Sequence, residues 1–576
     1  MNPDYTININ DSFKLPIYYN KEKKSLKKNI KDDLELTNPV DSSSNPIYHY
    51  FFNTENDLSK KLIEQTAEYY TTDISFLKDK QELLKKYKPC NVKYTKYSPN
   101  YEKIVELWNE IKNDTGFKEK YYYMDWDMLE FLNRSELFLQ IMSIYNMTSP
   151  VISLFVPIII LIIPFFIIKI KGLNITLSEY IQVLKIVVQT NAIGKLFTTF
   201  NDVSINEKVY LIISAAFYVF SIYQNIMVCI RFNNNMNKIH NYFNEIKHYL
   251  SHSIESMENY LQYSEALASQ KEFNDVLKEK ITILKHFNNK ITLVTEYKIL
   301  NYKKINEIGF IMKYFYELYD DTTLNETFLY SFGFNGYIDC LEGLQKNLEE
   351  IKINFTQFTD NNKKTIIKNN YYACLKDSTP VKNDIKLKKN MIITGPNASG
   401  KTTVLKSTLI NILFSQQFGC GFYDSAIISP FHHIHCYLNI PDTSGRDSLF
   451  QAEARRCKEI LDTIDSNKKE RHFCTFDELY SGTNPDEAIA SAKSFMEYIV
   501  KKKTVSCILT THFVKVCKKL SKNENVMNCH METEKVNDKL KYKYKLKQGI
   551  SEIKGGISVL TEMNYPKEIL DKTKFL

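Results

Sequence analysis

The sequence lacks closely spaced cysteine pairs. Its 11 cysteines are scattered through 576 residues without a CxxC motif, which argues against a disulfide framework or a zinc knuckle, because both need tighter spacing. Reduced thiols are typical of proteins inside the cell. The first 16 residues also lack the basic and then apolar pattern of a secretory signal. We therefore expect an intracellular protein.

A strong excess of one charge is lacking as well. The formal net charge is +8, which permits a phosphate-rich partner but does not require one. We also find no internal repeat of fixed period, which argues against a solenoid or propeller.

Charged residues are absent from two long apolar runs, residues 137–168 and 209–230. Each run exceeds the length of about 18 apolar residues that suggests a membrane-spanning helix. Lys169, Lys171 and Arg231 flank the runs and would lie at the level of the lipid headgroups. Two such spans would return the chain to the same side of a membrane, with the flanking parts cytoplasmic.

Two buried core helices are the alternative interpretation of these runs. Pro157 and Pro164 favour a bilayer for the first run, because membrane helices tolerate proline better than soluble ones. Four polar residues weaken the case for the second run: Ser214, Ser221, Gln224 and Asn225. We predict a membrane hairpin within residues 137–231.

The remaining sequence divides by its patterns into helical and mixed parts. We predict a mixed fold class: a C-terminal α/β domain with a mainly parallel sheet, preceded by an all-α lever or arm region with one or two membrane-type helices. The expected segments are a disordered stretch at 1–55, a helical region at 56–136, the hairpin at 137–231, a helical lever or clamp at 232–370, and the α/β domain at 371–576.

A phosphate-binding loop is the clearest motif. Residues 395–402 read Gly-Pro-Asn-Ala-Ser-Gly-Lys-Thr, follow a strand expected at 390–394 and open a helix. The glycines let backbone N–H groups surround phosphates, and the helix start adds its positive dipole end. Lys401 would bind the β- and γ-phosphates of ATP, and Thr402 would bind Mg²⁺. The predicted nucleotide-binding residues are Gly395, Pro396, Asn397, Ala398, Ser399, Gly400, Lys401, Thr402 and Thr403.

An acidic pair and a histidine complete the predicted catalytic set with Lys401. Asp477 and Glu478 end an apolar stretch that begins at His472. Asp477 would hold Mg²⁺, and Glu478 would polarise the attacking water as general base. His512 follows the strand expected at 505–509 and would sense the γ-phosphate. Taken alone, the carboxylates could form an exposed turn, and His512 could be an ordinary residue at a strand end.

Ser448 precedes a helix expected from Leu449 and admits two compatible interpretations. With Gln451 it fits a capping box. The same helix start would also leave N–H groups free to bind the γ-phosphate held by a partner subunit.

Two families of P-loop ATPases combine such a loop, acidic pair and histidine, and three further segments of the sequence distinguish between them. Residues 477–484 read Asp-Glu-Leu-Tyr-Ser-Gly-Thr-Asn, residues 444–453 read Ser-Gly-Arg-Asp-Ser-Leu-Phe-Gln-Ala-Glu, and residues 544–559 hold Tyr-Lys-Leu-Lys-Gln-Gly and then Gly-Ile-Ser-Val. They resemble the ATPase domain of the MutS (DNA mismatch repair) superfamily, as does the Val-Lys-Asn-Asp entry at 381–384. The resemblance implies that the C-terminal α/β domain is a P-loop NTPase domain of the ABC/MutS type. An ABC-type transport component is disfavoured, because ABC proteins usually place proline directly after the catalytic glutamate.

The resemblance covers about residues 370–576 and implies a homodimer with two composite ATP sites. Each site would combine residues 395–402, Asp477, Glu478 and His512 of one subunit with Ser448 of the other, using ATP and Mg²⁺. In the family, helical arms grip double-stranded DNA, which implies mismatch repair or DNA damage sensing. The alternative is a membrane-anchored ATP switch that moves a protein partner without recognising mismatches.

Mismatch readers of the family insert a phenylalanine from an F-x-E motif near the N-terminus, and we find none there. Residues 315–317 and 243–245 mimic the motif but lie in expected helices. We expect both phenylalanines to pack on helical faces.

Overall fold

The computed structural model describes residues 8–573, except 42, 55, 91–98, 173–175, 191–193, 197–199, 295–305, 361–364, 439, 441–447, 537–538, 554–559, 562 and 564. Their contacts define two compact units. The helical unit holds Tyr94–His252 and Thr282–Thr327, and the mixed unit holds Asn8–Lys93, Ser253–Ile281 and Phe328–Leu576. The mixed unit therefore joins an N-terminal segment to the C-terminal domain, which a linear division of the sequence did not predict.

The helical unit contains α6 (Tyr101–Lys112), α7 (Phe117–Lys120), η2 (Asp127–Arg134), α8 (Glu136–Ile170), α9 (Leu177–Thr190) and α14 (Ile308–Asp320). Parts of α11 (Ile205–Ser264), α12 (Lys271–Thr292) and α15 (Thr322–Glu349) belong to each unit. Phe315 is fully buried and packs on Phe117, with ring centroids 5.2 Å apart. The prediction that this phenylalanine packs on a helical face is therefore confirmed.

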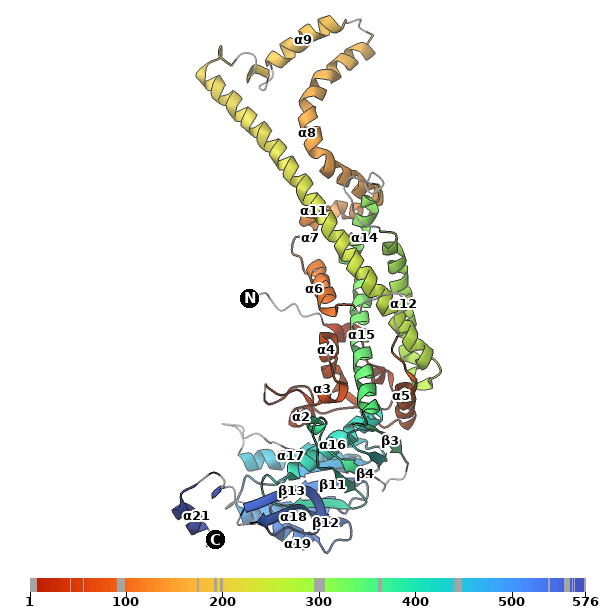
Figure 1. The fold of residues 1–576 in the computed structure, drawn as a ribbon, viewed down its shortest axis with the longest axis vertical. Coiled ribbons are helices and arrows are strands. Elements are labelled where there is room, and N and C mark those ends of the chain that lie inside the picture. Colours follow the sequence, from red (N-terminus) through yellow and green to blue (C-terminus); the bar gives the residue numbers. More distant parts are fainter. Residues whose placement is uncertain are drawn as a thin grey trace. The chain divides into compact units, whose positions relative to one another are not determined.

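Helices α8 and α11 carry the two apolar runs, and α9 lies between them along the chain (Figure 1). By length and composition alone, both helices are long and apolar enough to cross a membrane. The most apolar stretch within Glu136–Phe155 of α8 is only 22% buried inside the structure, and that of α11 only 6%. Tyr218 donates to the Ser153 carbonyl at 3.1 Å, so the helices touch at this level. Large apolar side chains are exposed on both, among them Ile159, Ile163, Ile213 and Phe217.

The N-terminal segment of the mixed unit is folded over the described residues within 8–54, contrary to the expectation of disorder for residues 1–55, of which residues 1–7 lie outside the described part of the chain. Its elements are α1 (Ile9–Ser12), η1 (Pro16–Tyr19), β1 (Lys23–Ser25), α2 (Lys28–Asp33) and α3 (Ile47–Phe52), followed by α4 (Asp57–Thr66), β2 (Tyr69–Thr71) and α5 (Ile74–Lys86). Phe13, Leu34 and Phe51 are fully buried. These elements are too short for a clear period in the sequence, and distant parts of the chain supply their packing.

Helix α16 (Lys401–Phe418) is the main partner of this segment. The Phe51 ring stacks on Phe414 with centroids 4.0 Å apart. The Tyr48 hydroxyl donates to Oε1 of Gln417 at 2.8 Å, and Gln417 in turn donates to the Thr66 carbonyl at 3.0 Å. The N-terminal segment therefore packs directly on the helix that follows the phosphate-binding loop.

A six-stranded sheet forms the centre of the C-terminal part, in the order β13-β12-β6-β11-β10-β9. Five strands pair in parallel, as predicted, and β13 is antiparallel. The expected strands at 390–394 and 505–509 are confirmed as β6 and β11. The bounds are β6 (Asn390–Thr394), β9 (His433–Tyr437), β10 (His472–Asp477), β11 (Val505–Thr510), β12 (Val526–Val536) and β13 (Lys539–Gln548).

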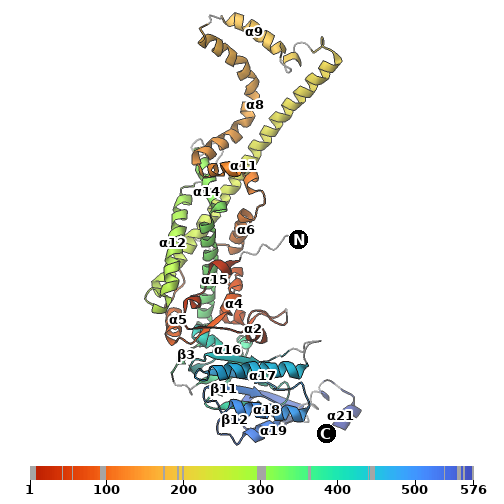
Figure 2. The ribbon, with the colours of Figure 1, turned by 180° about the vertical axis from the view of Figure 1, so that it is seen from behind.

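A second sheet has the order β5-β4-β8-β3-β7 and begins at Asn354, earlier than the boundary predicted at residue 371. Its strands are β3 (Asn354–Phe358), β4 (Ile366–Asn370), β5 (Asn383–Lys386), β7 (Cys420–Gly421) and β8 (Ser425–Ile428). The other helices are η3 (Ala268–Gln270), η4 (Ala373–Leu375), α17 (Leu449–Ser466), α18 (Pro485–Ile499), α19 (Val514–Leu520) and α21 (Lys567–Thr573). Helix α16 lies on one face of the six-stranded sheet, and α18 and α19 lie on the other (Figures 1 and 2).

Candidate nucleotide-binding site

The predicted phosphate-binding loop connects β6 to α16 at the carboxyl edge of the six-stranded sheet. Helix α16 begins at Lys401, so the positive end of its dipole lies at the loop. Gly400 (φ 92°) and Ala398 (φ 61°) adopt left-handed backbone conformations that curl the loop. The loop borders a cavity of about 530 Å³, lined by Asn397 to Val404 together with Glu478, Met531 and Tyr544. Such a cavity is within the usual size of a small-molecule site.

Asp477 lies beside the loop because its strand is one strand removed from β6. In the sheet register, Asp477 is level with Thr510 of β11, and Thr510 is level with Ile393 of β6. The Thr402 hydroxyl donates to Oδ2 of Asp477 at 2.9 Å, and the Thr510 hydroxyl donates to Oδ1. A hydroxyl and a carboxylate are the hard oxygen donors that Mg²⁺ prefers, so this pair fits the ion.

Glu478, His512 and Lys401 meet on the other side of the loop. Nε2 of His512 lies 2.8 Å from Oε1 of Glu478 and 3.1 Å from Nζ of Lys401. An ionised carboxylate only accepts hydrogen bonds, so Nε2 must carry its proton to bond Glu478, and it cannot then accept from Lys401. The Lys401 ammonium donates instead to the Pro396 carbonyl at 3.2 Å. An anionic oxygen placed between Nζ of Lys401 and Nε2 of His512 would accept a hydrogen bond from each.

The charges of the site act on one another. The hydrogen bond from His512 lowers the pKa of Glu478, and the Lys401 charge adds to this effect. Burial lowers the pKa of Lys401, and the nearby carboxylates of Glu478 and Asp477 oppose that shift. Glu478 therefore stays ionised at neutral pH, the form that a general base needs. Its backbone has φ 52°, a strained conformation of the kind that recurs at functional sites.

Tyr544 is a cavity residue to which sequence reasoning assigned no role. The pairing of β12 with β13 shifts register between Met531 and Thr533, and Tyr544 lies in this bulge with φ 54°. Bulges near functional sites redirect side chains. A Cβ built on Gly400 would lie 3.2 Å from Cδ1 of Tyr544, so the ring covers the loop closely. The only signal in the sequence was the Tyr-x-Leu pattern at 544–546.

Ser448 lies outside the cavity of its own chain. It caps α17 through the predicted capping box: Gln451 N donates to the Ser448 hydroxyl at 3.3 Å, and Ser448 N donates to Oε1 of Gln451 at 3.0 Å. The preceding residues, Ser444 to Asp447, lie outside the described part of the chain. Ser448 is not among the described residues that line the 530 Å³ cavity.

A buried carboxylate joins α17 to the segment after the acidic pair. Glu453, 2% exposed, accepts from Ser481 N at 3.0 Å and from Gly482 N at 3.2 Å. A Cβ on Gly482 would lie 2.7 Å from Cγ of Leu449, so a side chain there would push the helix away. Helix α17 is therefore bonded to the segment that follows Glu478, four residues before Gly482.

Comparisons with known proteins support the interpretation of this region. Residues 391–575 match the family model of MutS domain V. The chain is 28% identical over 204 residues to a DNA mismatch repair protein MutS of Prochlorococcus marinus, covering 35% of this chain and 22% of that protein. It is 27% identical over 215 residues to that of Persephonella marina (36% and 24%). It is 28% identical over 245 residues to an Endonuclease MutS2 of Staphylococcus epidermidis (42% and 30%). The matched segment thus spans less than a third of each relative.

Proposed function

The chain is a member of the MutS superfamily, and from that premise we propose that it hydrolyses ATP at the cavity built around Lys401, Asp477 and Glu478. The observation that carries the proposal is the convergence of one ammonium and two carboxylates on the loop at 395–400. Mg²⁺, bound by Thr402 and Asp477, would neutralise charge on the phosphates. Glu478 would orient and deprotonate the attacking water, while Lys401 and His512 would donate to the phosphate oxygens.

DNA is the partner that the family suggests. Two of the three relatives above are named for DNA mismatch repair and the third as an endonuclease. We propose that ATP turnover in this chain is coupled to binding of double-stranded DNA, in mismatch repair or DNA damage sensing. We expect mismatched or branched duplexes to stimulate the ATPase more than perfect duplexes. DNA binding should weaken steeply with salt, because phosphate contacts release counterions.

The test is a steady-state ATPase assay across a panel of DNA structures at two salt concentrations, with the Glu478→Gln variant as the blank. Turnover that ignores every DNA, together with no salt-sensitive binding, would remove the DNA part of the proposal and leave the ATPase part.

The composite dimer site leads to a prediction for Ser448. If it acts on the partner's γ-phosphate, Ser448→Ala should lower turnover by roughly 10- to 100-fold, the effect of losing a hydrogen bond to a charged group. Mixed dimers show whether Ser448 acts on the ATP site of its own subunit or on that of its partner. One Ser448→Ala subunit paired with one Glu478→Gln subunit keeps a complete site only if Ser448 acts across the dimer.

We therefore expect the mixed dimer to retain about half of the wild-type turnover, since one of two sites survives. Action within one subunit would leave no complete site and almost no turnover. Ser448→Asn serves as the control for folding, because asparagine still caps the helix.

A membrane-anchored ATP switch acting on a protein partner is the second candidate, and the exposed apolar surface of α8 and α11 favours it. Contiguous exposed apolar patches of this kind mark interaction or membrane surfaces. From Ser153, where the helices touch, to Ile170 at the end of α8, the helix rises about 25 Å at 1.5 Å per residue. This is close to the bilayer core of about 30 Å.

Under this candidate, the full chain should sediment with membranes and resist extraction by high salt, yet dissolve in detergent. A matched variant in which a short linker replaces residues 137–231 should become soluble without losing its ATPase activity. A full chain that stays in the supernatant without detergent would reject the anchor.

A further inference from the structure

One wall of the nucleotide cavity is a stretch without strand structure, residues 371–381, between β4 and β5. Tyr371, Tyr372, Leu375 and Ser378 from this stretch line the same cavity as the phosphate-binding loop. Its only regular element is the single turn η4. Tyr371 N donates to the Phe422 carbonyl at 3.1 Å, but no strand pairing holds the rest of the wall, so side-chain contacts help to fix its position.

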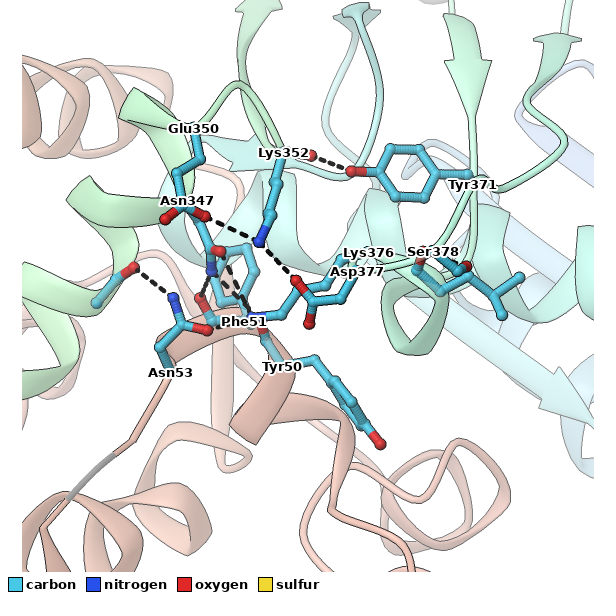
Figure 3. A network of polar contacts seen from close by, with 12 residues as sticks. Tyr50, Phe51, Asn53, Asn347, Glu350, Lys352, Tyr371, Lys376, Asp377 and Ser378 are labelled. Carbon is cyan, nitrogen blue, oxygen red and sulfur yellow. Dashed lines mark hydrogen bonds and ion pairs between the residues drawn. The ribbon is translucent and has the colours of Figure 1, made fainter.

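Lys376 supplies such contacts but does not itself line the cavity. Its Nζ donates to the Tyr50 carbonyl at 2.7 Å and to Oδ1 of Asn53, and lies 3.5 Å from Oδ1 of Asn347 (Figure 3). All three acceptors are neutral oxygens. Burial lowers the pKa of Lys376 to about 8, and the nearest carboxylate, Asp377, bonds Lys352 instead.

The acceptors come from α15 and from the end of α3, and these two helices also bond directly to each other. The amide of Asn347, which is fully buried in α15, donates to the Tyr50 and Phe51 carbonyls of α3 at 3.2 and 2.8 Å. A Cβ on Gly343 would lie 1.5 Å from the Phe52 carbonyl oxygen, so α15 and α3 are in backbone contact there. The ammonium of Lys376 therefore ties the cavity wall to a rigid pair of helices.

We infer that Lys376 is a positioning residue for the nucleotide: it clamps the cavity wall to the ends of α3 and α15, and so raises the affinity for ATP and links ATP binding to the last turn of α15. The inference rests on the proposed ATP site. Binding is reciprocal. If the contacts of Lys376 raise the affinity of the cavity for ATP, then bound ATP must stabilise those contacts by the same free energy. The catalytic groups lie on α16 and in the segments directly after β10 and β11, so the clamp should act on binding and leave the chemical step alone.

The test compares three variants by Mg²⁺–ATP binding and steady-state kinetics. Lys376→Met keeps the volume but removes the donor, and we expect the Kd and KM for ATP to rise about tenfold while kcat changes by less than about twofold. Lys376→Arg keeps charged donors and should restore most of the affinity. Lys352→Met removes the partly solvated ion pair that Asp377 of the same wall forms with Lys352, and it should raise Kd far less than Lys376→Met does, because solvated pairs contribute little.

Hydrogen exchange with and without ATP distinguishes a positioning role from a role in stability alone, because only a positioning role makes the exchange near Lys376 depend on ATP. In the wild-type protein, ATP should slow exchange in residues 346–349 and in α3, and in Lys376→Met this protection should vanish. If Lys376→Met does not fold, Asn53→Gly removes one acceptor while keeping the left-handed backbone (φ 50°), and should raise Kd by about threefold.

The outcomes separate this inference from the proposed function. A wild-type protein that binds no ATP overturns both. A wild-type protein that binds ATP, with Lys376→Met binding equally well or losing kcat instead of affinity, overturns the positioning role alone.

Discussion

Replacing Glu478 by glutamine is expected to lower ATP turnover by about 10²- to 10⁴-fold, the usual contribution of a general base, while ATP binding is retained. The substitution keeps the size of the side chain and removes its charge and its basicity. Glutamine can still accept the hydrogen bond from His512, so the site should keep its geometry. Steady-state ATPase rates and equilibrium binding of Mg²⁺–ATP measure the two effects separately.

A matched control for this variant is Glu487→Gln. Glu487 lies in the first turn of α18, where it accepts a hydrogen bond from the Thr483 hydroxyl at 2.8 Å and is exposed. Its loss should leave turnover within about twofold. Unchanged turnover in Glu478→Gln would contradict the role of Glu478 as base, and another group would have to activate the water.

Replacing Lys401 by alanine is expected to weaken ATP binding by about 100-fold or more, as for loss of strong hydrogen bonds from a charged donor, and to abolish turnover. Lys401 is only 5% exposed, so bulk water screens its charge weakly. Its loss would also leave Asp477 and Glu478 without the cation that offsets them, and two carboxylates would then repel the triphosphate. Binding of Mg²⁺–ATP is the direct measurement.

Lys493→Ala provides the comparison for loss of one positive charge. Lys493 forms an ion pair with Glu497 along α18, 3.4 Å long and largely solvated, and its removal should leave ATP binding unchanged. If Lys401→Ala bound ATP as tightly as Lys493→Ala, the phosphates would have to lie elsewhere.

The phosphate-binding loop and the acidic pair could be predicted because their signals are local. Eight consecutive residues specify the loop, and Asp477 and Glu478 stand at the end of a short apolar strand. Parallel strands place their carboxyl ends at one edge, so the meeting of Thr402 with Asp477 also followed from the sequence.

The missed features depend on contacts between distant parts of the chain. Tyr544 reaches the cavity through a bulge that only the pairing of β12 with β13 creates. The contacts of Lys376 with residues 50 and 53 span more than 300 positions. The folding of the described residues within 8–54 likewise depends on packing against α16, and no local hydrophobic period in the sequence predicts it. Sequence patterns report short-range periodicity, so such packing escapes them.

The packing of the N-terminal segment on α16 also bears on the order of events during synthesis. Tyr48 and Gln417 are 369 positions apart, so at 5–20 residues per second the ribosome needs roughly 20–70 s to deliver the partner of Tyr48 after Tyr48 itself. Through that interval Phe51 and its neighbours have no α16 to cover them. The nascent chain should therefore depend on a chaperone during translation, and the ATP site should mature only as the last third of the chain emerges.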